Sequence, residues 1–204
     1  MIYEVRTYDM KPGAVPQAEE AFAEALPYRE KYSPIAPSGT PRWAAEPDHP
    51  RLGLRQPGRA GAYPRRGEPG AQLASQNHPG QHREHELRGL DAGPFMRPMG
   101  GDQALGNIYE MRVYTYENGS MPELLRRWAD SLPYREEFSP LAAGMYTEFG
   151  NLNRWMHVWP YKDLNHRAEV RAEASKIPQW PSGAPGRVSQ ENKIMIPASF
   201  SPMH

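Results

Sequence analysis

The sequence predicts an α+β protein made of ferredoxin-like β-α-β-β-α-β units, and two observations carry this prediction. The first is an internal repeat at an offset of 106 residues: Ile2–Tyr8 (IYEVRTY) recurs as Ile108–Tyr114 (IYEMRVY), and Leu26–Pro34 (LPYREKYSP) recurs as Leu132–Pro140 (LPYREEFSP). The second is the order in which strand-like and helix-like hydrophobic patterns follow one another in the second copy. Two units of about 100 residues each are therefore expected.

The second copy begins with a strand and a helix. Residues 108–115 alternate at the period of a strand, with Tyr109, Met111 and Val113 on one face and Glu110, Arg112 and Tyr114 on the other. Ser120 is a residue type that caps helix N-termini. The apolar residues after it recur at helical spacing, at Leu124, Leu125, Trp128 and Leu132. A helix that begins at Ser120 is therefore predicted.

A hairpin, a second helix and a last strand complete this unit. The strand-like segments 145–149 and 154–161 are separated by a turn at Gly150, which predicts a hairpin. Asp163 is placed to cap a helix, and residues 192–196 form the last predicted strand. The apolar residues of that helix are Leu164, Ala168, Val170 and Ala172. The resulting order is that of the ferredoxin-like fold.

The composition argues against several classes of protein. Lys and Arg total 24, as do Asp and Glu, so the chain has no net positive charge to attract nucleic acid or an anionic membrane. The absence of cysteine removes disulfides, thiol catalysis and cysteine-based metal sites. No apolar stretch approaches about 18 residues, and the N-terminal MIYEVRTYDM is unlike a targeting peptide. We therefore expect a cytoplasmic protein without a membrane span.

Residues 37–93 differ in composition from the rest of the chain. They contain eight Pro, nine Gly and eight Arg but no Ile, Val, Phe, Met or Lys, so we expect them to be irregular or disordered. The predicted organisation is a strand-and-helix remnant of the first unit over 1–36, this segment, a linker over 94–106 with the Gly-rich Met99–Gly106, and an intact unit over 107–204.

A shifted reading frame explains the composition of this segment. When the codons are read one base later, Trp43 and Ala44 together force Gly, and Pro50 and Arg51 permit His. The permitted string Gly-Pro-Leu-Asn-Gln-Ile-Ile-His-Val-Trp-Ala-Tyr parallels Gly150–Tyr161 (GNLNRWMHVWPY) at a constant offset of 107. We favour compensating frameshifts over a disordered linker, and the nucleotide sequence across the segment tests this interpretation.

Several motifs of the second copy occur in a fixed order. They are Ile108–Arg112 (IYEMR), Tyr146–Arg154 (YTEFGNLNR), His157–Tyr161 (HVWPY), Arg167–Arg171 (RAEVR) and Ser189–Ile194 (SQENKI). With these motifs the second copy, together with the in-frame start of the first, resembles the NIPSNAP family. The resemblance implies a dimeric α/β barrel, in which two ferredoxin-like units join their sheets. These units are either the two repeats of one chain or the second units of two chains. The activity of that family is not settled, so the resemblance assigns no catalytic residues to this chain, and we expect no cofactor.

One face of the predicted sheet suits a small-molecule pocket. If the helices pack on the face of Met111, Val113, Met156 and Val158, the opposite face points into the barrel. It carries the candidate ligand-pocket residues Glu110, Arg112, Tyr146, Glu148, Trp155 and His157. Aromatic rings with a few polar groups are typical of ligand sites. The alternative is a filled barrel in which His157 is hydrogen-bonded and Glu110 pairs with Arg112 or a neighbour.

The remaining charged groups are interpreted structurally. Arg135 ends the first helix in a motif repeated in the first copy, which indicates capping and contact between units. An anion-facing Arg at the barrel mouth is the alternative. Arg167 and Arg171 lie four residues apart beside glutamates and predict a solvated helix face. His82 and His85 have zinc-ligand spacing, but the shifted frame makes them by-products, so no metal site is expected.

Two functional hypotheses follow. The first is a NIPSNAP-like barrel that binds a small apolar ligand or another protein, as a homodimer or with its intact unit paired to another copy. The alternative is a small barrel enzyme of monooxygenase, isomerase or dehydratase type, which acts on an apolar substrate with His157 as the proton-transfer group. An open barrel interior reached by His157 and Arg112 favours the enzyme, whereas an interior filled with aromatic rings favours a scaffold.

Overall fold

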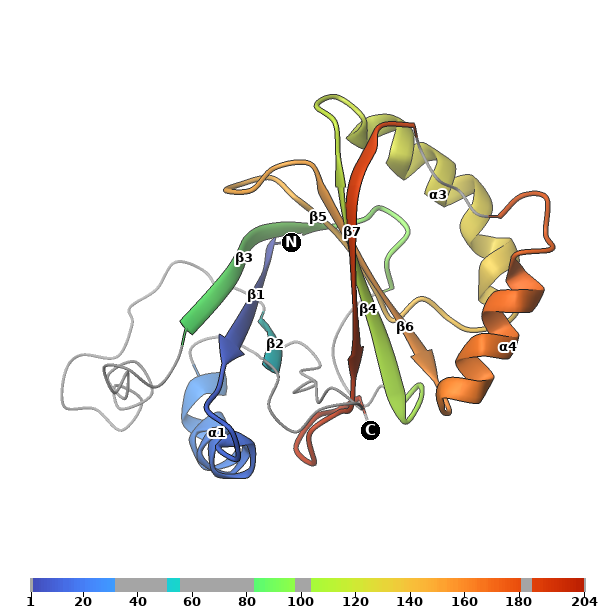
Figure 1. Ribbon diagram of the computed structural model, residues 1–204. Coiled ribbons are helices and arrows are strands. Elements are labelled where there is room, and N and C mark those ends of the chain that lie inside the picture. The colour runs from blue at the N-terminus through green and yellow to red at the C-terminus, as the bar shows by residue number, and fades with distance from the viewer. Residues whose placement is uncertain (1, 32–50, 56–82, 98–103, 181–184, 204) are drawn as a thin grey trace.

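The computed structural model describes residues 2–31, 51–55, 83–97, 104–180 and 185–203. Figure 1 shows the described elements, which are β1 (Ile2–Asp9), α1 (Val15–Glu30), β2 (Arg51–Arg55), β3 (Arg83–Ala92), β4 (Ile108–Tyr116), α3 (Met121–Glu136), β5 (Ala143–Thr147), β6 (Arg154–Tyr161), α4 (Leu164–Ala174) and β7 (Arg187–Met195). None of the described helices is both long enough and apolar enough to span a membrane. The cytoplasmic location stays a prediction.

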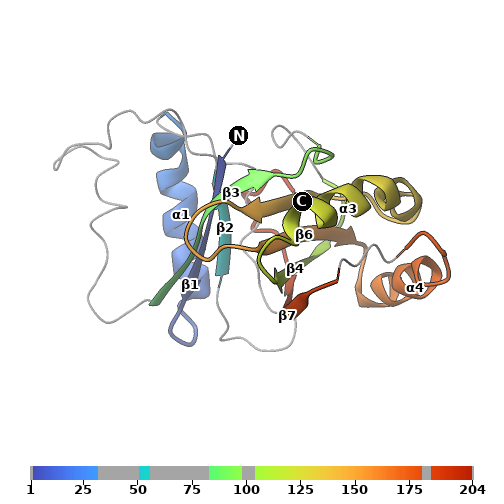
Figure 2. The same ribbon diagram turned by 90° about the horizontal axis from the view of Figure 1, so that it is seen from above.

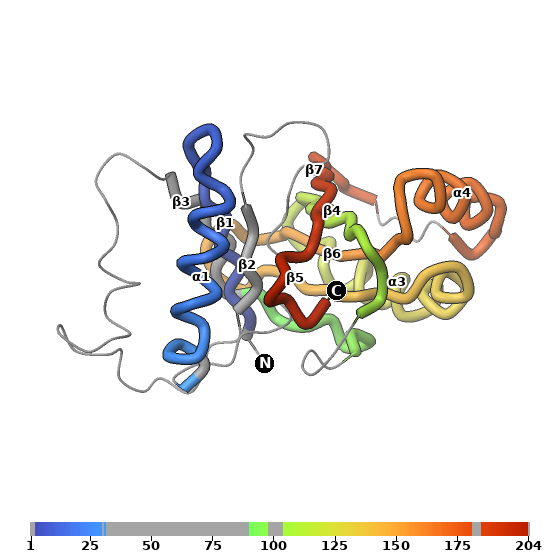
Figure 3. The backbone as a smooth tube through the Cα atoms, turned by 90° about the horizontal axis from the view of Figure 1, so that it is seen from below, coloured from blue at the N-terminus to red at the C-terminus, as the bar shows by residue number. Residues whose placement is uncertain are grey.

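The described strands form one curled antiparallel sheet in the order β2-β1-β3-β5-β6-β4-β7. Its second half begins at β5, where β4 lies between β6 and β7 and β5 pairs with β6. This is the ferredoxin-like arrangement, so the predicted order β-α-β-β-α-β is confirmed for this half. Figure 2 and Figure 3 show α1 on one side of the sheet and α3 and α4 on the other.

The first half of the sheet contains two strands that the composition argued against. β1 lies between β2 and β3, as β4 lies between β6 and β7. Both β2 and β3 fall within 37–93, so the expected irregular structure does not extend to these two stretches. A strand needs backbone partners above all, and β1 supplies them to both. Residues 37–50 and 56–82 lie outside the described residues, and the frameshift, the repeat and the domain limits stay predictions.

The strands β3 and β5 join the two halves. Their pairing places Leu90 opposite Thr147 and Ala92 opposite Met145. Gly93 follows β3 and donates its backbone N–H to the carbonyl of Gly144 at 2.8 Å. One continuous sheet therefore curls between α1 and the pair of helices α3 and α4.

The helices α3 and α4 begin where the sequence predicts. Ser120 is the N-terminal cap position of α3, although its side chain makes no capping hydrogen bond, and Pro122 occupies the first turn, where a missing N–H costs nothing. Leu124, Trp128 and Leu132 form the buried face of this helix. Asp163 caps α4, because its Oδ1 accepts from the backbone N–H of His166 at 2.8 Å.

Two apolar cores lie on opposite faces of the sheet, and the helices cover the face that the sequence interpretation did not choose. Met111, Val113, Met156 and Val158 do not meet α3 and α4 but pack with Tyr3 and Val5 on the other face. The face under α3 and α4 carries Tyr114, Trp155, Trp159 and Tyr161, and it also carries His157. The alternation correctly predicted which residues share a face, but the prediction of which face α3 and α4 cover is wrong. The reason is that α4 supplies arginine partners to the buried Glu110, so this polar face can lie beneath helices.

Candidate functional site

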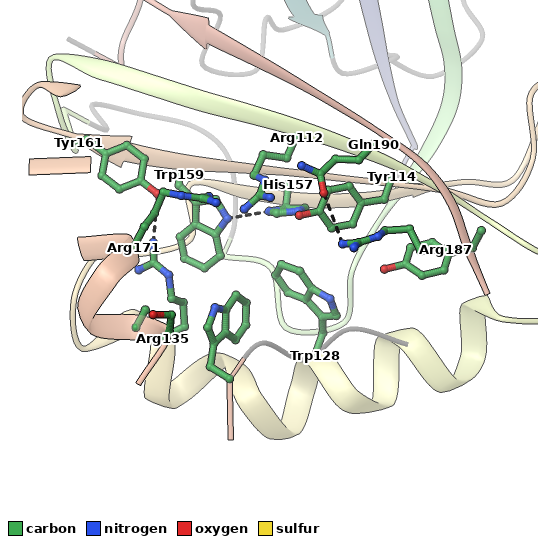
Figure 4. A pocket seen from close by; sticks show the side chains of 14 residues that line it. Arg112, Tyr114, Trp128, Arg135, His157, Trp159, Tyr161, Arg171, Arg187 and Gln190 are labelled. Atoms are coloured by element: carbon green, nitrogen blue, oxygen red, sulfur yellow. Dashed lines mark hydrogen bonds between the residues drawn. The ribbon is translucent and has the colours of Figure 1, made fainter. Parts of the chain in front are cut away.

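A cavity of about 390 Å³ lies between the sheet and the helices α3 and α4. Its lining comes from β4, β6 and β7 on the sheet side and from α3, α4 and the segment after α4 on the other side. Figure 4 shows four arginines, a group of aromatic rings and His157 around the same space. The volume is at the lower end of the range that small-molecule sites occupy.

His157 on β6 is the most deeply buried polar residue of the cavity wall, with 1% of its surface exposed. Its Nδ1 accepts a hydrogen bond from the indole N–H of Trp159 at 2.6 Å. A neutral imidazole that accepts at Nδ1 carries its proton on Nε2. That Nε2 is buried and has no hydrogen-bond partner among the described residues. The ring therefore carries a buried N–H donor on the face of the sheet that lies under α3 and α4.

The protonation state of His157 follows from its surroundings. Burial lowers the pKa of His157 well below its ordinary value of 6.5, and the positive charges of Arg112, Arg135 and Arg171 lower it further. The imidazole is accordingly neutral at neutral pH. Its N–H is therefore a hydrogen-bond donor on a ring without charge.

Aromatic rings from three segments surround this histidine. The ring of Trp128, on α3, lies 4.6 Å from that of His157 and 5.2 Å from that of Trp180, centroid to centroid. Trp180 is nearly perpendicular to both Trp128 and Trp159, at 81° in each case. Tyr114 of β4 meets His157 edge-on at 5.0 Å. Edge-to-face contacts of this kind hold rings in fixed orientations, so the cavity has a rigid aromatic wall.

Arg135 is a buried cation held by neutral groups. It is 3% exposed, and its guanidinium donates to the hydroxyl of Tyr161 at 3.1 Å and to the carbonyl of Ser139 at 3.3 Å. It lies 4.1 Å from the ring centroid of Trp159, in cation–π contact. Burial lowers the pKa of Arg135, although an arginine remains charged at physiological pH. The cavity therefore contains a positive charge that no ion pair among the described residues neutralises.

Two further arginines meet at Tyr114. The guanidinium carbons of Arg112 and Arg187 each lie 5.2 Å from its ring centroid. Arg112 donates to the amide oxygen of Asn192 and Arg187 to that of Gln190, both at 3.4 Å. Arg187 and Gln190 are exposed on β7, whereas Arg112 is half-buried on β4. The rim of the cavity is thus polar and exposed, and its floor is aromatic and buried.

Glu110 ties the sheet to α4. This fully buried carboxylate accepts from Arg167 at 2.6 Å, and its other oxygen lies 3.5 Å from Arg171. Arg112 is 3.9 Å away on the same strand. The hydrogen bond to Glu110 raises the pKa of Arg167. The predicted solvated face of α4 is therefore wrong for Arg167 and Arg171, which turn inward to this carboxylate.

The NIPSNAP family model matches residues 109–202, the segment that builds this site. A nipsnap family protein of unknown function from Agrobacterium tumefaciens, known from its crystal structure, is 31% identical over 52% of this chain and 100% of that chain, with a TM-score of 0.45. The chain belongs to the NIPSNAP family. The resemblance drawn from the sequence motifs is confirmed.

Curated NIPSNAP relatives match about half of the chain. Protein NipSnap homolog 1 of Danio rerio is 37% identical over 101 residues, which are 48% of this chain and 36% of that protein. Protein NipSnap homolog 2 of Homo sapiens is 32% identical over 48% of this chain and 35% of that protein. The chain therefore spans about a third of the length of these two curated relatives.

A likeness in fold alone extends over almost the whole chain. A putative monooxygenase from Lactobacillus acidophilus superposes with a TM-score of 0.63 over 97% of this chain and 94% of that chain, at 9% identity. Together with the curled antiparallel sheet, this shows the ferredoxin-like fold of the dimeric α/β-barrel type. At this identity the likeness says nothing about chemistry.

The structure of this NIPSNAP protein separates the predicted pocket residues into three groups. Arg112 and His157 line the cavity. Glu110 lies beneath it in ion pairs with α4, and Trp155 is buried with its ring 4.9 Å from that of Trp128. The other two lie away from the cavity lining, Tyr146 half-buried on β5 and Glu148 exposed beyond the end of β5. The candidates shared a side of the sheet, but only part of that side faces the cavity.

Sequence reasoning missed several cavity residues of the NIPSNAP domain. Trp128 was assigned to the helix core, while Trp180 and Arg187 received no role. Arg135 was considered as an anion-facing residue, and the structure places it in the cavity wall. The signal that links these positions is chemical: each element that contacts the cavity contributes an arginine, an aromatic residue or both. Among the described residues no group of acidic or histidine side chains could hold a metal ion, and the side chains of His82 and His85 lie outside the description.

Proposed function

We propose that the NIPSNAP domain of residues 107–204 binds a small molecule in the cavity between the sheet and the helices α3 and α4. The observation that carries this proposal is the buried N–H of His157 at the cavity wall. A buried donor left unpaired costs about 1–3 kcal/mol. A ligand that accepts from this N–H offsets the cost, so the arrangement favours an occupied cavity.

The other face of the sheet supports the same choice of site. Its core of Met111, Met145, Met156 and Val158 packs closely with Tyr3 and Val5 from β1. These side chains are apolar and fully or almost fully buried. A ligand that uses polar contacts therefore finds them under the helices and not on this face.

The enzymatic alternative, with His157 in proton transfer, receives less support. A general acid or base works best when its pKa lies near the operating pH, and burial and the neighbouring arginines move the pKa of His157 well below that range. The hydrogen bond from Trp159 also occupies Nδ1, the atom that would take up a proton. The surroundings of His157 favour a fixed donor over a proton carrier.

A blocking variant tests the proposal. Ser175 lines the cavity and is exposed, so Ser175→Trp places a bulky ring at the mouth, whereas Lys176→Trp places the same ring on the neighbouring exposed position. We expect neutral, anionic and cationic aromatic fragments to include compounds that raise the thermal unfolding midpoint of the wild-type protein and of Lys176→Trp but not of Ser175→Trp. Fragments that stabilise all three proteins equally, or none that stabilise the wild type, contradict the proposal.

We also propose that the chain pairs with a second copy of itself. Among the described strands β7 pairs with β4 alone, and six of its residues, Arg187–Asn192, are exposed. An edge strand with free backbone groups is a site for pairing. Light scattering during size-exclusion chromatography should give twice the mass of the chain, and a monomer at every protein concentration contradicts the pairing.

A further inference from the structure

Resting on the small-molecule binding proposed above, we infer that the ligand is an aromatic acid, with its carboxylate between Arg112, Arg187 and His157 and its ring against the tryptophans of the cavity. The sequence predicted a small apolar ligand. The cavity wall departs from that prediction because its polar groups are almost all donors and cations.

The charge of the cavity wall favours an anion. Four arginines line the cavity, and no Asp or Glu does so among the described residues. Glu110, the nearest buried carboxylate, is already bound to Arg167 and Arg171 of α4. None of the ion pairs among the described residues involves Arg135 or Arg187. Like charges in a partly buried space repel one another, and an anion removes that repulsion.

The donors also lie close together. Arg112 and Arg187 both contact the ring of Tyr114, which meets His157 edge-on at 5.0 Å. The charges of Arg112, Arg135 and Arg171 also reach the imidazole. The imidazole itself adds the buried N–H that no described residue accepts from. Guanidinium groups match the two oxygens of a carboxylate. An oxyanion beside His157 therefore receives a neutral donor and the field of several cations at once.

The aromatic wall of the cavity offers contacts that a bare inorganic anion would not use. Trp128, Trp159 and Trp180 approach one another with centroids 5.2–6.2 Å apart. Trp180 is nearly perpendicular to the other two, so the three rings form an angled wall of the cavity. Rings of a ligand pack favourably against such edges and faces. The ligand thus combines an acid with a planar apolar body.

A matched pair of probes tests this inference. 2-Naphthoate and 2-naphthamide share one ring system and differ in charge, and binding of each is followed through tryptophan fluorescence and calorimetry. We expect the acid to bind at least about 10-fold more tightly than the amide, since each charge-assisted hydrogen bond contributes measurably to affinity. The preference should weaken as salt increases. Benzoate should bind more weakly than 2-naphthoate, and inorganic phosphate more weakly still.

Arginine variants locate the acid. Arg187→Gln, at an exposed position, should weaken 2-naphthoate binding about 10-fold and leave 2-naphthamide unchanged, and Arg112→Gln should act in the same way. Arg126→Gln is the control, because Arg126 pairs with Glu123 and Asp130 on an exposed side of α3 and does not line the cavity. Unchanged circular dichroism and unfolding midpoints show that each variant is folded.

The outcomes separate this inference from the proposed function. Equal affinity for the acid and the amide overturns the aromatic-acid assignment and leaves small-molecule binding in place. Phosphate that binds as tightly as 2-naphthoate overturns the aromatic part of the assignment. If both arginine variants still bind the acid more tightly than the amide, the placement of the carboxylate between Arg112, Arg187 and His157 is wrong. Failure of all four probes and of the fragment set overturns the inference and the proposed function together.

Discussion

The replacement Glu110→Gln tests how the helix layer is anchored above the cavity. Glu110 is fully buried on β4, and its carboxylate accepts from Arg167 at 2.6 Å and lies 3.5 Å from Arg171. Glutamine keeps the size of the side chain but removes its negative charge. Two guanidiniums on α4 then face one another across a neutral amide, so we expect the folded state to be destabilised.

The size of the effect follows from burial. Removing one partner of a fully buried ion pair costs about 3–5 kcal/mol. Here Arg167 and Arg171 keep 25% and 37% of their side-chain surface exposed, so water partly replaces the lost partner. We therefore expect the free energy of unfolding to fall by about 2–3 kcal/mol. In a chain of 204 residues this lowers the thermal midpoint by about 4–12 °C. Urea unfolding and calorimetry measure both quantities.

Glu123→Gln is the matched control for this replacement. Glu123 also bonds to two arginines, Arg126 and Arg127, but the three side chains keep between 42% and 62% of their surface exposed on α3. Exposed ion pairs contribute little to stability, so this variant should unfold close to the wild-type midpoint. If Glu110→Gln unfolds at the same midpoint as Glu123→Gln, the reasoning that a buried carboxylate anchors α4 is refuted.

Three other predictions concern the same region. The pKa of His157 lies well below 6.5 in the folded state, so below pH 6.5 the unfolded state binds more protons and the wild type loses stability on acidification. Between pH 7 and about pH 5 the thermal unfolding midpoint of His157→Gln should therefore fall less steeply than that of the wild type. Equal slopes for the two proteins would contradict this. Trp128→Ala should cost about 3–5 kcal/mol in urea unfolding, because it empties the centre of the helix-side core; a loss under about 1 kcal/mol argues against a tightly packed core. Gly106→Ala places a Cβ 2.8 Å from the carbonyl oxygen of Tyr161 and should lower the free energy of unfolding by about 1–3 kcal/mol in the same assay. If this variant is as stable as the wild type, the backbone moves aside without strain.

Local patterns predicted the elements of residues 107–204 well. The strand 154–161 and the Asp163 cap agree with β6 and α4, and the expected strand 108–115 is one residue shorter than β4. These features depend on side-chain alternation and on capping, which neighbouring residues determine. The last strand is longer than expected, since β7 begins at Arg187 and not at Asn192. The residues at its start are polar and exposed, so they show no hydrophobic alternation. Only their pairing with β4 shows that they form a strand.

The cavity could not be predicted in the same way. Alternation on β4 and β6 groups Arg112 with His157 but does not show which face the helices cover. That depends on a contact between Glu110 and Arg167, which are 57 residues apart in the sequence. Trp180 and Arg187 belong to segments with no periodic pattern and reach the site through the tertiary fold. Such positions become functional candidates only when the helices are placed on the sheet.

The imidazole of His157 gives the most direct test of the central claim, that a neutral buried donor presents its N–H to an anionic ligand in this cavity. Nitrogen-15 spectra of the histidine side chains report the tautomer and the environment of each ring nitrogen. We expect His157 to be neutral at pH 7 with its proton on Nε2, and 2-naphthoate to shift this resonance more than 2-naphthamide does. A proton on Nδ1, a charged imidazole, or a resonance unchanged at saturating 2-naphthoate would contradict the account.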